Sequence, residues 1–212
     1  MRPEEVLLGC GSGEVLRYVT EAYTSPQRAL VTAAPTFEIP TRTATRLGAP
    51  VREVRVYTRL HLDLDGMIAA APGAGLVFFC NPNNPTGTVY GKSDTLAFVR
   101  GVHQRAPDAA VLVDEAYFEY VDEPSYDTLI PQAIEDPRII VARTFSKVHG
   151  LAGMRVGYAI AHEKTIARLE PLRMASGVNV LAARAAAVSL GLREHVTREQ
   201  AANRNTRDFV IR

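Results

Sequence analysis

Short apolar runs alternate with amphipathic stretches along the first three-quarters of the chain. The run Gly75-Leu-Val-Phe-Phe-Cys80 is apolar on both faces, as in the buried strands of parallel sheets. By the same criteria, the sequence predicts strands at 6–8, 28–32, 51–56, 75–80, 110–113, 138–142 and 156–161. Helical spacing predicts helices at 14–23, 37–48, 93–105, 163–172 and 179–191, with a short one after Gly66 and a polar, helix-like stretch at 197–212.

Residues 121–137 are rich in Pro, Asp and Glu, and we expect them to form a surface excursion. The alternation of strands and helices on either side of this segment is typical of an α/β protein. We therefore predict a doubly wound, mostly parallel sheet flanked by helices, with a helical C-terminal part.

Polar or glycine-rich segments follow four of the predicted strands. The first is Gly9-Cys-Gly-Ser-Gly13, which stands between a strand and a helix. Free backbone N–H groups at such a helix start can bind a phosphate, although the segment is not a complete P-loop or dinucleotide motif. The second is Asn81-Pro-Asn-Asn-Pro-Thr-Gly87, which is either an ordinary turn or a rigid loop that directs an amide at a ligand.

The third segment, Asp114-Glu-Ala-Tyr117, places carboxylates at the carboxyl end of a buried strand, where open α/β sheets bind ligands. The fourth contains Lys147 and, eight positions later, Arg155. A lysine amine can form a Schiff base with a carbonyl, whereas an arginine is a better clamp for phosphate. The alternative, which the pair alone would favour, is that both are ordinary surface cations. We expect the four segments to meet at one edge of the sheet, where they would suit a phosphorylated aldehyde.

Composition narrows the classes of partner. The chain has 212 residues, 47% of them hydrophobic, a formal net charge of +1 and a pI near 7.8. Dispersed arginines and a near-neutral charge give no basis for a nucleic-acid partner, and no segment has the length of a membrane span. Cys10 and Cys80 lack the close Cys or His neighbours of a metal site, so we predict buried free thiols, no metal and a cytoplasmic location.

The order of these motifs resembles that of the fold-type I pyridoxal-phosphate (PLP) enzymes, and in particular the class I/II aminotransferases and their histidinol-phosphate aminotransferase branch. The resemblance rests on Asn84-Pro-Thr-Gly87, Asp114-Glu-Ala-Tyr117 and the stretch from Ser146 to Arg155, and it runs from Leu7 onward. It implies pyridoxal 5'-phosphate as cofactor and a cofactor-binding set of Ser12, Gly13, Phe37, Asn84, Asp114, Tyr117, Thr144, Ser146, Lys147 and Arg155.

The resemblance also assigns roles, with Lys147, Asp114 and Tyr117 as the catalytic group. Lys147 would form the internal aldimine and later move the substrate's α-proton, and Asp114 would pair with the pyridine nitrogen. Asn84 and Tyr117 would bind the cofactor's phenolate oxygen. Phe37 would stack on the ring, and Arg155 with Ser12, Gly13, Thr144 and Ser146 would hold the phosphate.

Members of this family carry an N-terminal segment and a small C-terminal domain that have no counterpart in this sequence. We therefore expect residues 1–190 to form the PLP-binding large domain and residues 191–212 to begin the connection to a small domain. The implied activity is amino transfer between an amino acid or amino-phosphate and a 2-oxo acid, in a homodimer. A decarboxylase of the threonine-phosphate type and a catalytically silent cofactor-binding fragment are the alternatives. A NAD-binding Rossmann domain is disfavoured because the glycine spacing is incomplete.

Overall fold

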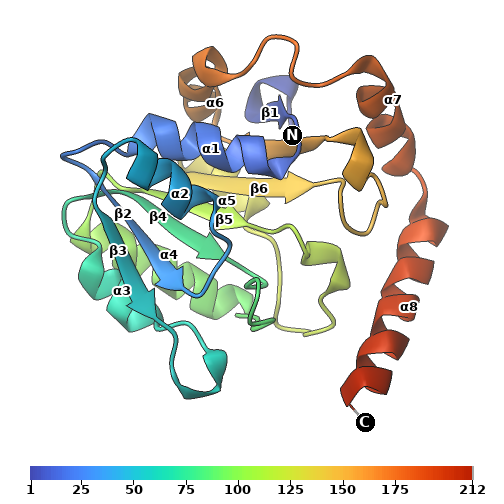
Figure 1. The fold of residues 1–212 in the computed structure, drawn as a ribbon, viewed down its shortest axis with the longest axis horizontal. Helices are drawn as coiled ribbons and strands as arrows, with labels where there is room; N and C mark the ends of the chain where they lie inside the picture. The colour runs from blue at the N-terminus through green and yellow to red at the C-terminus, as the bar shows by residue number, and fades with distance from the viewer. Residues whose placement is uncertain (212) are drawn as a thin grey trace.

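The computed structural model describes residues 1–211, which form one seven-stranded sheet between two layers of helices (Figure 1). The strand order is β1-β7-β6-β5-β4-β2-β3. The strands are β1 (Val6–Gly9), β2 (Ala29–Ala34), β3 (Val51–Arg55), β4 (Ala74–Cys80), β5 (Ala110–Asp114), β6 (Ile139–Thr144) and β7 (Gly157–Ala161). All seven predicted strands are present, and the prediction of a mostly parallel α/β sheet is confirmed.

Only β7 runs against the others, pairing antiparallel with both β6 and β1. Parallel neighbours need a long crossover, usually a helix. Between β6 and β7 the chain has no α-helix, only the loop that carries Lys147 and a 3-10 turn at Ala152–Met154. Because β1 is antiparallel to β7, it points the same way as the remaining strands. The carboxyl ends of β1, β4, β5 and β6 therefore lie at one edge of the sheet.

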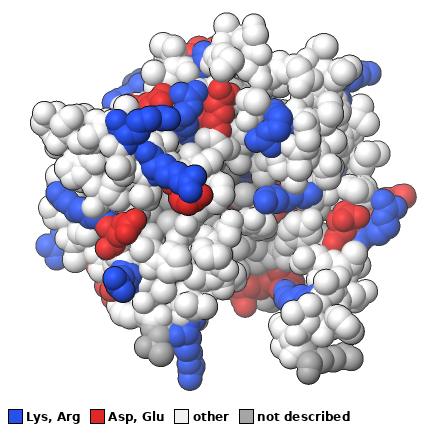
Figure 2. Space-filling view, viewed as in Figure 1, with Lys and Arg blue, Asp and Glu red and all other residues white. Residues whose placement is uncertain are grey.

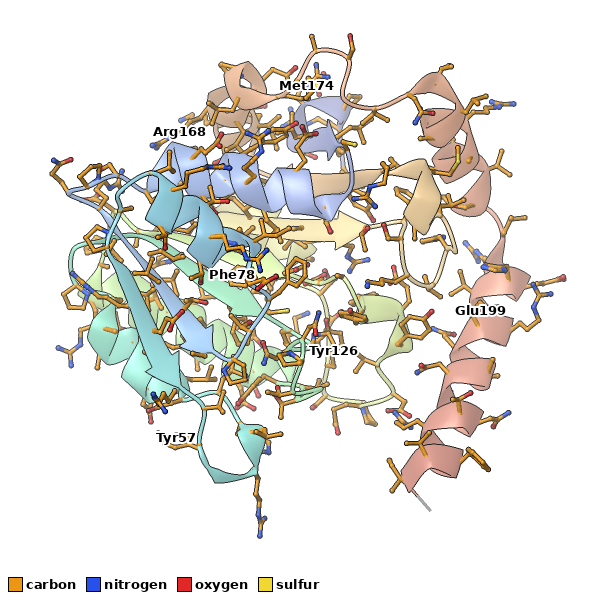
Figure 3. The ribbon with its side chains drawn as sticks, in the orientation of Figure 1. Tyr57, Phe78, Tyr126, Arg168, Met174 and Glu199 are labelled. Atoms are coloured by element: carbon orange, nitrogen blue, oxygen red, sulfur yellow. The ribbon has the colours of Figure 1, made fainter. Side chains whose placement is uncertain are left out.

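Alternation along the strands builds a separate core on each face of the sheet. On β4, Leu76 and Phe78 face α1 and α2, whereas Val77 and Phe79 face α3 and α4. Phe78 is labelled in Figure 3. The helices are α1 (Ser12–Tyr23), α2 (Ile39–Arg46), α3 (Leu64–Ala70), α4 (Lys92–Arg105), α5 (Ile130–Glu135), α6 (Glu163–Leu169), α7 (Val180–Ser189) and α8 (Arg193–Ile211).

Three sequence predictions need correction. The segment 121–137 is not wholly an excursion, because α5 forms within it and buries Ala133 against the sheet. Pro131 lies in the first turn of α5, where its missing N–H has no helical partner to lose. The predicted helix 163–172 stops at Leu169 and continues as a 3-10 turn at Glu170–Leu172, which contains Pro171. Cys80 is buried, but Cys10 is only half-buried because it lies on the turn before α1.

The C-terminal helix α8 stands off from the body of the molecule (Figure 1). None of its residues is buried, and within the described chain the last buried residue is Ser189. On the face shown in Figure 2, basic and acidic side chains are interspersed. Among residues 1–211, no helix combines the length and the apolar character needed to cross a membrane.

Candidate active site

A cavity of about 300 Å³ lies at the carboxyl edge of the sheet. It is enclosed by the start of α1, the loop after β4, the end of β5 and the loop after β6. All ten predicted cofactor-binding residues line it: Ser12, Gly13, Phe37, Asn84, Asp114, Tyr117, Thr144, Ser146, Lys147 and Arg155. The four segments that the sequence singled out are thus brought together.

One end of the cavity consists of hydrogen-bond donors. Ser12 and Gly13 open α1, and the first amides of a helix have no intrahelical acceptor. The Arg155 guanidinium reaches the same turn and donates to the Cys10 carbonyl at 3.4 Å. Thr144 and Ser146 add hydroxyl groups from the end of β6. Such a donor set, together with the positive end of the helix dipole, suits an oxyanion such as a phosphate.

Two backbone conformations hold this end together. Gly11 has a φ of 78°, and a Cβ atom added there would collide with the Arg155 guanidinium. Arg155 itself adopts the left-handed conformation, with φ 58° and ψ 61°. A non-glycine residue is uncommon in that region, and it occurs where the surrounding structure fixes it. Here Arg155 Nη1 also donates to the Ala152 carbonyl at 2.8 Å.

Asp114 forms part of another wall of the cavity and is 3% exposed. Burial raises the pKa of its carboxyl group to about 7, and the charge of neighbouring Glu115 adds to the rise. The Ala116 amide, which donates to Asp114 Oδ1 at 3.2 Å, and the Lys147 amine lower the pKa and offset part of this effect. A cation placed against Asp114 would restore the carboxylate.

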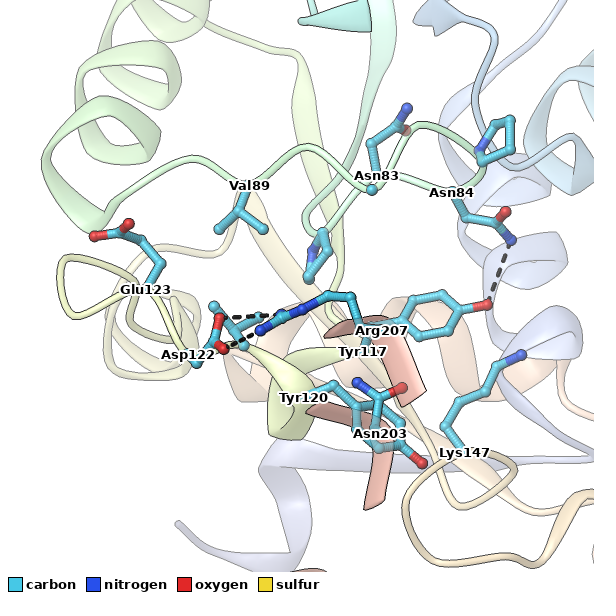
Figure 4. A pocket seen from close by; sticks show the side chains of 14 residues that line it. Asn83, Asn84, Val89, Tyr117, Tyr120, Asp122, Glu123, Lys147, Asn203 and Arg207 are labelled. Atoms are coloured by element: carbon cyan, nitrogen blue, oxygen red, sulfur yellow. Dashed lines mark hydrogen bonds and ion pairs between the residues drawn. The ribbon is translucent and has the colours of Figure 1, made fainter. Parts of the chain in front are cut away.

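Lys147 extends from the loop after β6, and its Nζ atom lies 4.8 Å from the centre of the Tyr117 ring. The Tyr117 hydroxyl and Asn84 Nδ2 are 3.5 Å apart, so both could donate to one oxygen atom between them (Figure 4). Phe37 is half-buried at the edge of the core. An amine, a carboxylate and two neutral donors therefore face a space beside an oxyanion site.

The loop after β4 owes its shape to two asparagines that the sequence analysis did not single out. The buried Asn83 side chain accepts from Thr36 Oγ1 at 2.6 Å and donates to the Pro35 carbonyl and to Thr86. Asn81 binds the backbone of Tyr90 through both ends of its amide. With these two turned inward, Asn84 is left to face the cavity. The contacts of Asn83 with Thr36 and Pro35, 47 and 48 positions away, have no signal in the local sequence.

The cavity opens next to a larger one of about 560 Å³, and Asn84, Tyr117 and Lys147 line both. Arg207 of α8 lines this outer cavity and pairs with Asp122 (Figure 4). Tyr120 and Asn203 line it as well. A ligand held at the inner site could extend into this space.

The chain matches one known protein family over almost its whole length. The profile of the family described as aminotransferase class I and II matches residues 1–210. A histidinol-phosphate aminotransferase of Moorella thermoacetica is 37% identical over 213 residues, covering 99% of this chain and 54% of the relative. One of Bacillus velezensis is 40% identical over 169 residues, covering 79% of this chain and 46% of the relative.

The fold is matched as well. The crystal structure of a histidinol-phosphate aminotransferase from Sinorhizobium meliloti, in complex with pyridoxal-5'-phosphate, superimposes with a TM-score of 0.92 at 25% identity. The match covers 99% of this chain and 56% of that one. The chain spans about half the length of the curated relatives it matches.

Proposed function

The chain belongs to the class I and II aminotransferases, and we propose that it carries the PLP-binding site of an enzyme that exchanges an amino group between an amino acid or amino-phosphate and a 2-oxo acid. The observation that supports this most is the single cavity that gathers an amine, a guanidinium, a helix start and a buried carboxylate. The names of the similar relatives favour a histidinol-phosphate-like substrate.

The residues present fit the cofactor. Arg155 and the first amides of α1 would bind the phosphate, with Thr144 and Ser146 donating hydroxyl hydrogen bonds. Phe37 would contact a face of the ring. Asn84 and Tyr117 would donate to the ring's oxygen. When bound, PLP supplies an aldehyde that captures amines and a ring that accepts electrons from the substrate's α-carbon.

Each catalytic residue then has a task that follows from its surroundings. The buried Asp114 carboxylate would keep a proton on the ring nitrogen, because an opposite charge is the group that best compensates its desolvation. The Lys147 amine would anchor the cofactor and, once displaced by the substrate amine, carry a proton to and from the α-carbon. Tyr117, whose ring packs beside Lys147 Nζ, would orient that amine.

Two further parts of the proposal concern organisation. Residues 1–190 would be the large domain and 191–212 the start of a connection, which is supported by the absence of buried residues after Ser189 within the described chain. A homodimer and a cytoplasmic location stay predictions. The decarboxylase of the threonine-phosphate type would use the same cavity, since the two reactions differ in how the substrate is oriented over the ring.

The test is capture of the cofactor on Lys147. We expect purified protein mixed with PLP to give a visible absorbance band, and borohydride reduction followed by peptide mapping to place a pyridoxyl group on Lys147. A Lys147→Ala variant should lose the band, whereas Lys164→Ala, outside the cavity, should keep it. An unmodified Lys147 in protein that binds PLP would contradict the assignment.

Substrate class is tested on the same sample. Histidinol phosphate and glutamate, added separately to the loaded protein, should each convert the band and release an oxo product without carbon dioxide. Release of carbon dioxide from a phosphorylated amino acid would favour the decarboxylase instead.

A further inference from the structure

A buried ion pair lies directly behind the cavity. Arg143 donates from both Nε and Nη2 to Glu115 Oε2, at 3.0 and 2.7 Å. The Glu115 side chain is 2% exposed and that of Arg143 is 12% exposed. The Arg143 guanidinium also stacks 3.8 Å above the centre of the Phe118 ring. Neither Glu115 nor Arg143 lines the two cavities around Lys147.

The pair joins the two strands that present the catalytic groups. Glu115 follows Asp114 at the end of β5, and Arg143 precedes Thr144 at the end of β6, the neighbouring strand (Figure 1). Side chains alternate between the faces of a sheet, so Asp114 and Thr144 face the cavity while Glu115 and Arg143 meet on the opposite face. The Glu115 amide also donates to the Ala142 carbonyl at 2.9 Å, which extends the strand pairing by one residue.

Glu115 holds a third segment at the same time. Its Oε1 accepts from the Leu129 amide and its Oε2 from Thr128 Oγ1, both at 2.8 Å. The carboxylate therefore has four donors from two segments of the chain. A network of this kind, fully satisfied and buried, has one well-defined geometry. It leaves little freedom for the ends of β5 and β6 to shift against each other.

We propose that Glu115 and Arg143 are positioning residues that fix the Lys147 amine relative to the Asp114 carboxylate by bracing the ends of β5 and β6 from behind. The proposal rests on the proposed function, in which Asp114 and Lys147 hold opposite ends of one cofactor ring. A misplacement of about 1 Å at a reacting centre can cost about a hundredfold, so a brace at this point has a large effect on bond formation.

The Glu115–Arg143 pair also affects the charge of Asp114. The Glu115 charge raises the pKa of Asp114, and Arg143 lies against Glu115 on the side away from the cavity. Loss of Arg143 alone would leave an uncompensated carboxylate next to Asp114. Loss of both charges would remove this effect on Asp114. Glu119, whose Oε1 lies 3.9 Å from Arg143 Nη1, would lose its partner in every variant that removes the Arg143 charge. A double variant therefore separates the positioning of Lys147 from the charge that Glu115 places beside Asp114.

The experiment compares two ligands that share a ring and a phosphate. PLP can bond to Lys147, whereas 4'-deoxypyridoxine 5'-phosphate lacks the aldehyde and cannot. The dissociation constant of the deoxy compound divided by that of PLP measures how well Lys147 is placed, independently of turnover. We would measure it for the unaltered protein, Arg143→Lys and Glu115→Gln/Arg143→Met. Arg138→Met is the matched control, because Arg138 lies just before β6, at the end far from the cavity, and pairs with Asp136 at 2.7 Å.

We expect the ratio to fall about tenfold to a hundredfold in the double variant, with a thermal midpoint close to that of the unaltered protein. Arg143→Lys should lie between the two, and Arg138→Met should match the unaltered protein. An unchanged ratio in both Arg143 variants would overturn the proposal while leaving the function intact. If the double variant does not fold, Arg143→Lys decides by itself. Failure of the unaltered protein to capture PLP on Lys147 would instead overturn the proposed function.

Discussion

At the scale of single residues, the chemistry of the site follows from unequal burial of its charged groups. Asp114 is 3% exposed, whereas Lys147 and Arg155 are exposed at the cavity rim. Folding therefore leaves these two cations in contact with water. Folding removes water from the Asp114 carboxylate, and its raised pKa reflects the cost of holding a charge at the cavity wall. A ligand that brings a cation to Asp114 offsets that cost.

The raised pKa of Asp114 predicts how stability depends on pH in the cofactor-free protein. The folded state has a pKa of about 7, compared with the ordinary value of 3.8, so it holds a proton that the unfolded chain has released. The free energy of unfolding therefore falls as pH rises between these values, by at most about 4 kcal/mol. Asp114→Asn cannot ionise and should show a shallower fall. Denaturant titrations at several pH values measure this, and equal slopes in both proteins would contradict it.

At the scale of elements, the turn between β1 and α1 shows how backbone shape and ligand chemistry depend on each other. Gly11 takes a positive φ, and its missing side chain leaves the space into which Arg155 reaches from beyond β6. The helix start and the guanidinium would otherwise be separate features. A single glycine thus decides whether these two groups of donors meet at one end of the cavity.

Replacing Gly11 by alanine should therefore have two effects. The left-handed conformation costs a residue with a Cβ atom about 1–2 kcal/mol, and the new methyl group would displace Arg155. We expect weaker binding of inorganic phosphate and of PLP, measured by titration. Gly48→Ala is the control, since Gly48 has a φ of 71° and its nearest neighbour would be Pro26 at 4.0 Å. It should lose similar stability and keep its affinity; equal affinities in the two variants would contradict the argument.

The sequence predicts the elements well where the pattern is local. All seven strands are present because their apolar runs are bounded by glycine or polar turns, and the cavity-lining residues follow from motifs at strand ends. Sequence-based prediction fails where a feature depends on contacts between residues that are far apart in the sequence. The helix α5 depends on Ala133 packing on the sheet. The inward roles of Asn81 and Asn83, and the pairing of Glu115 with Arg143 across 28 positions, have no local signal.

At the scale of the whole molecule, α8 differs from the other α-helices that the structure describes in how it is attached to the rest of the protein. It contributes no buried residue, and its links to the 118–122 region are a bond from Gln200 to the Glu119 carbonyl and the ion pair of Arg207 with Asp122. Its start is held by His195, which bonds to the Val148 carbonyl at 2.9 Å. Helices in proteins gain most of their stability from packing against the rest of the molecule, so we expect α8 to be the least stable of the described helices.

We therefore expect unequal hydrogen exchange along the 212-residue chain. Amides of α8 should exchange at least about a hundredfold faster than those of α4, which buries Thr95, Phe98, Val99 and Val102. Mass spectrometry of exchanged peptides measures this. Arg207→Ala should change α8 little, because an exposed ion pair contributes about 0–1 kcal/mol. Protection of α8 equal to that of α4 would contradict this view of the helix.

Because β7 pairs with β1, the sheet cannot be completed in the order in which its strands are synthesised. Val6 of β1 pairs with Ile160 of β7, so β1, which is made before the other six strands of this sheet, has no partner in it until nearly the whole sheet has been made. At typical rates of translation this delay is on the order of ten seconds. Strands β2 to β6 pair among themselves and can join earlier. A nascent chain that has just passed Lys147 thus already carries the amine and the carboxylate, whereas the strand that leads into the turn before α1 does not yet have its partner.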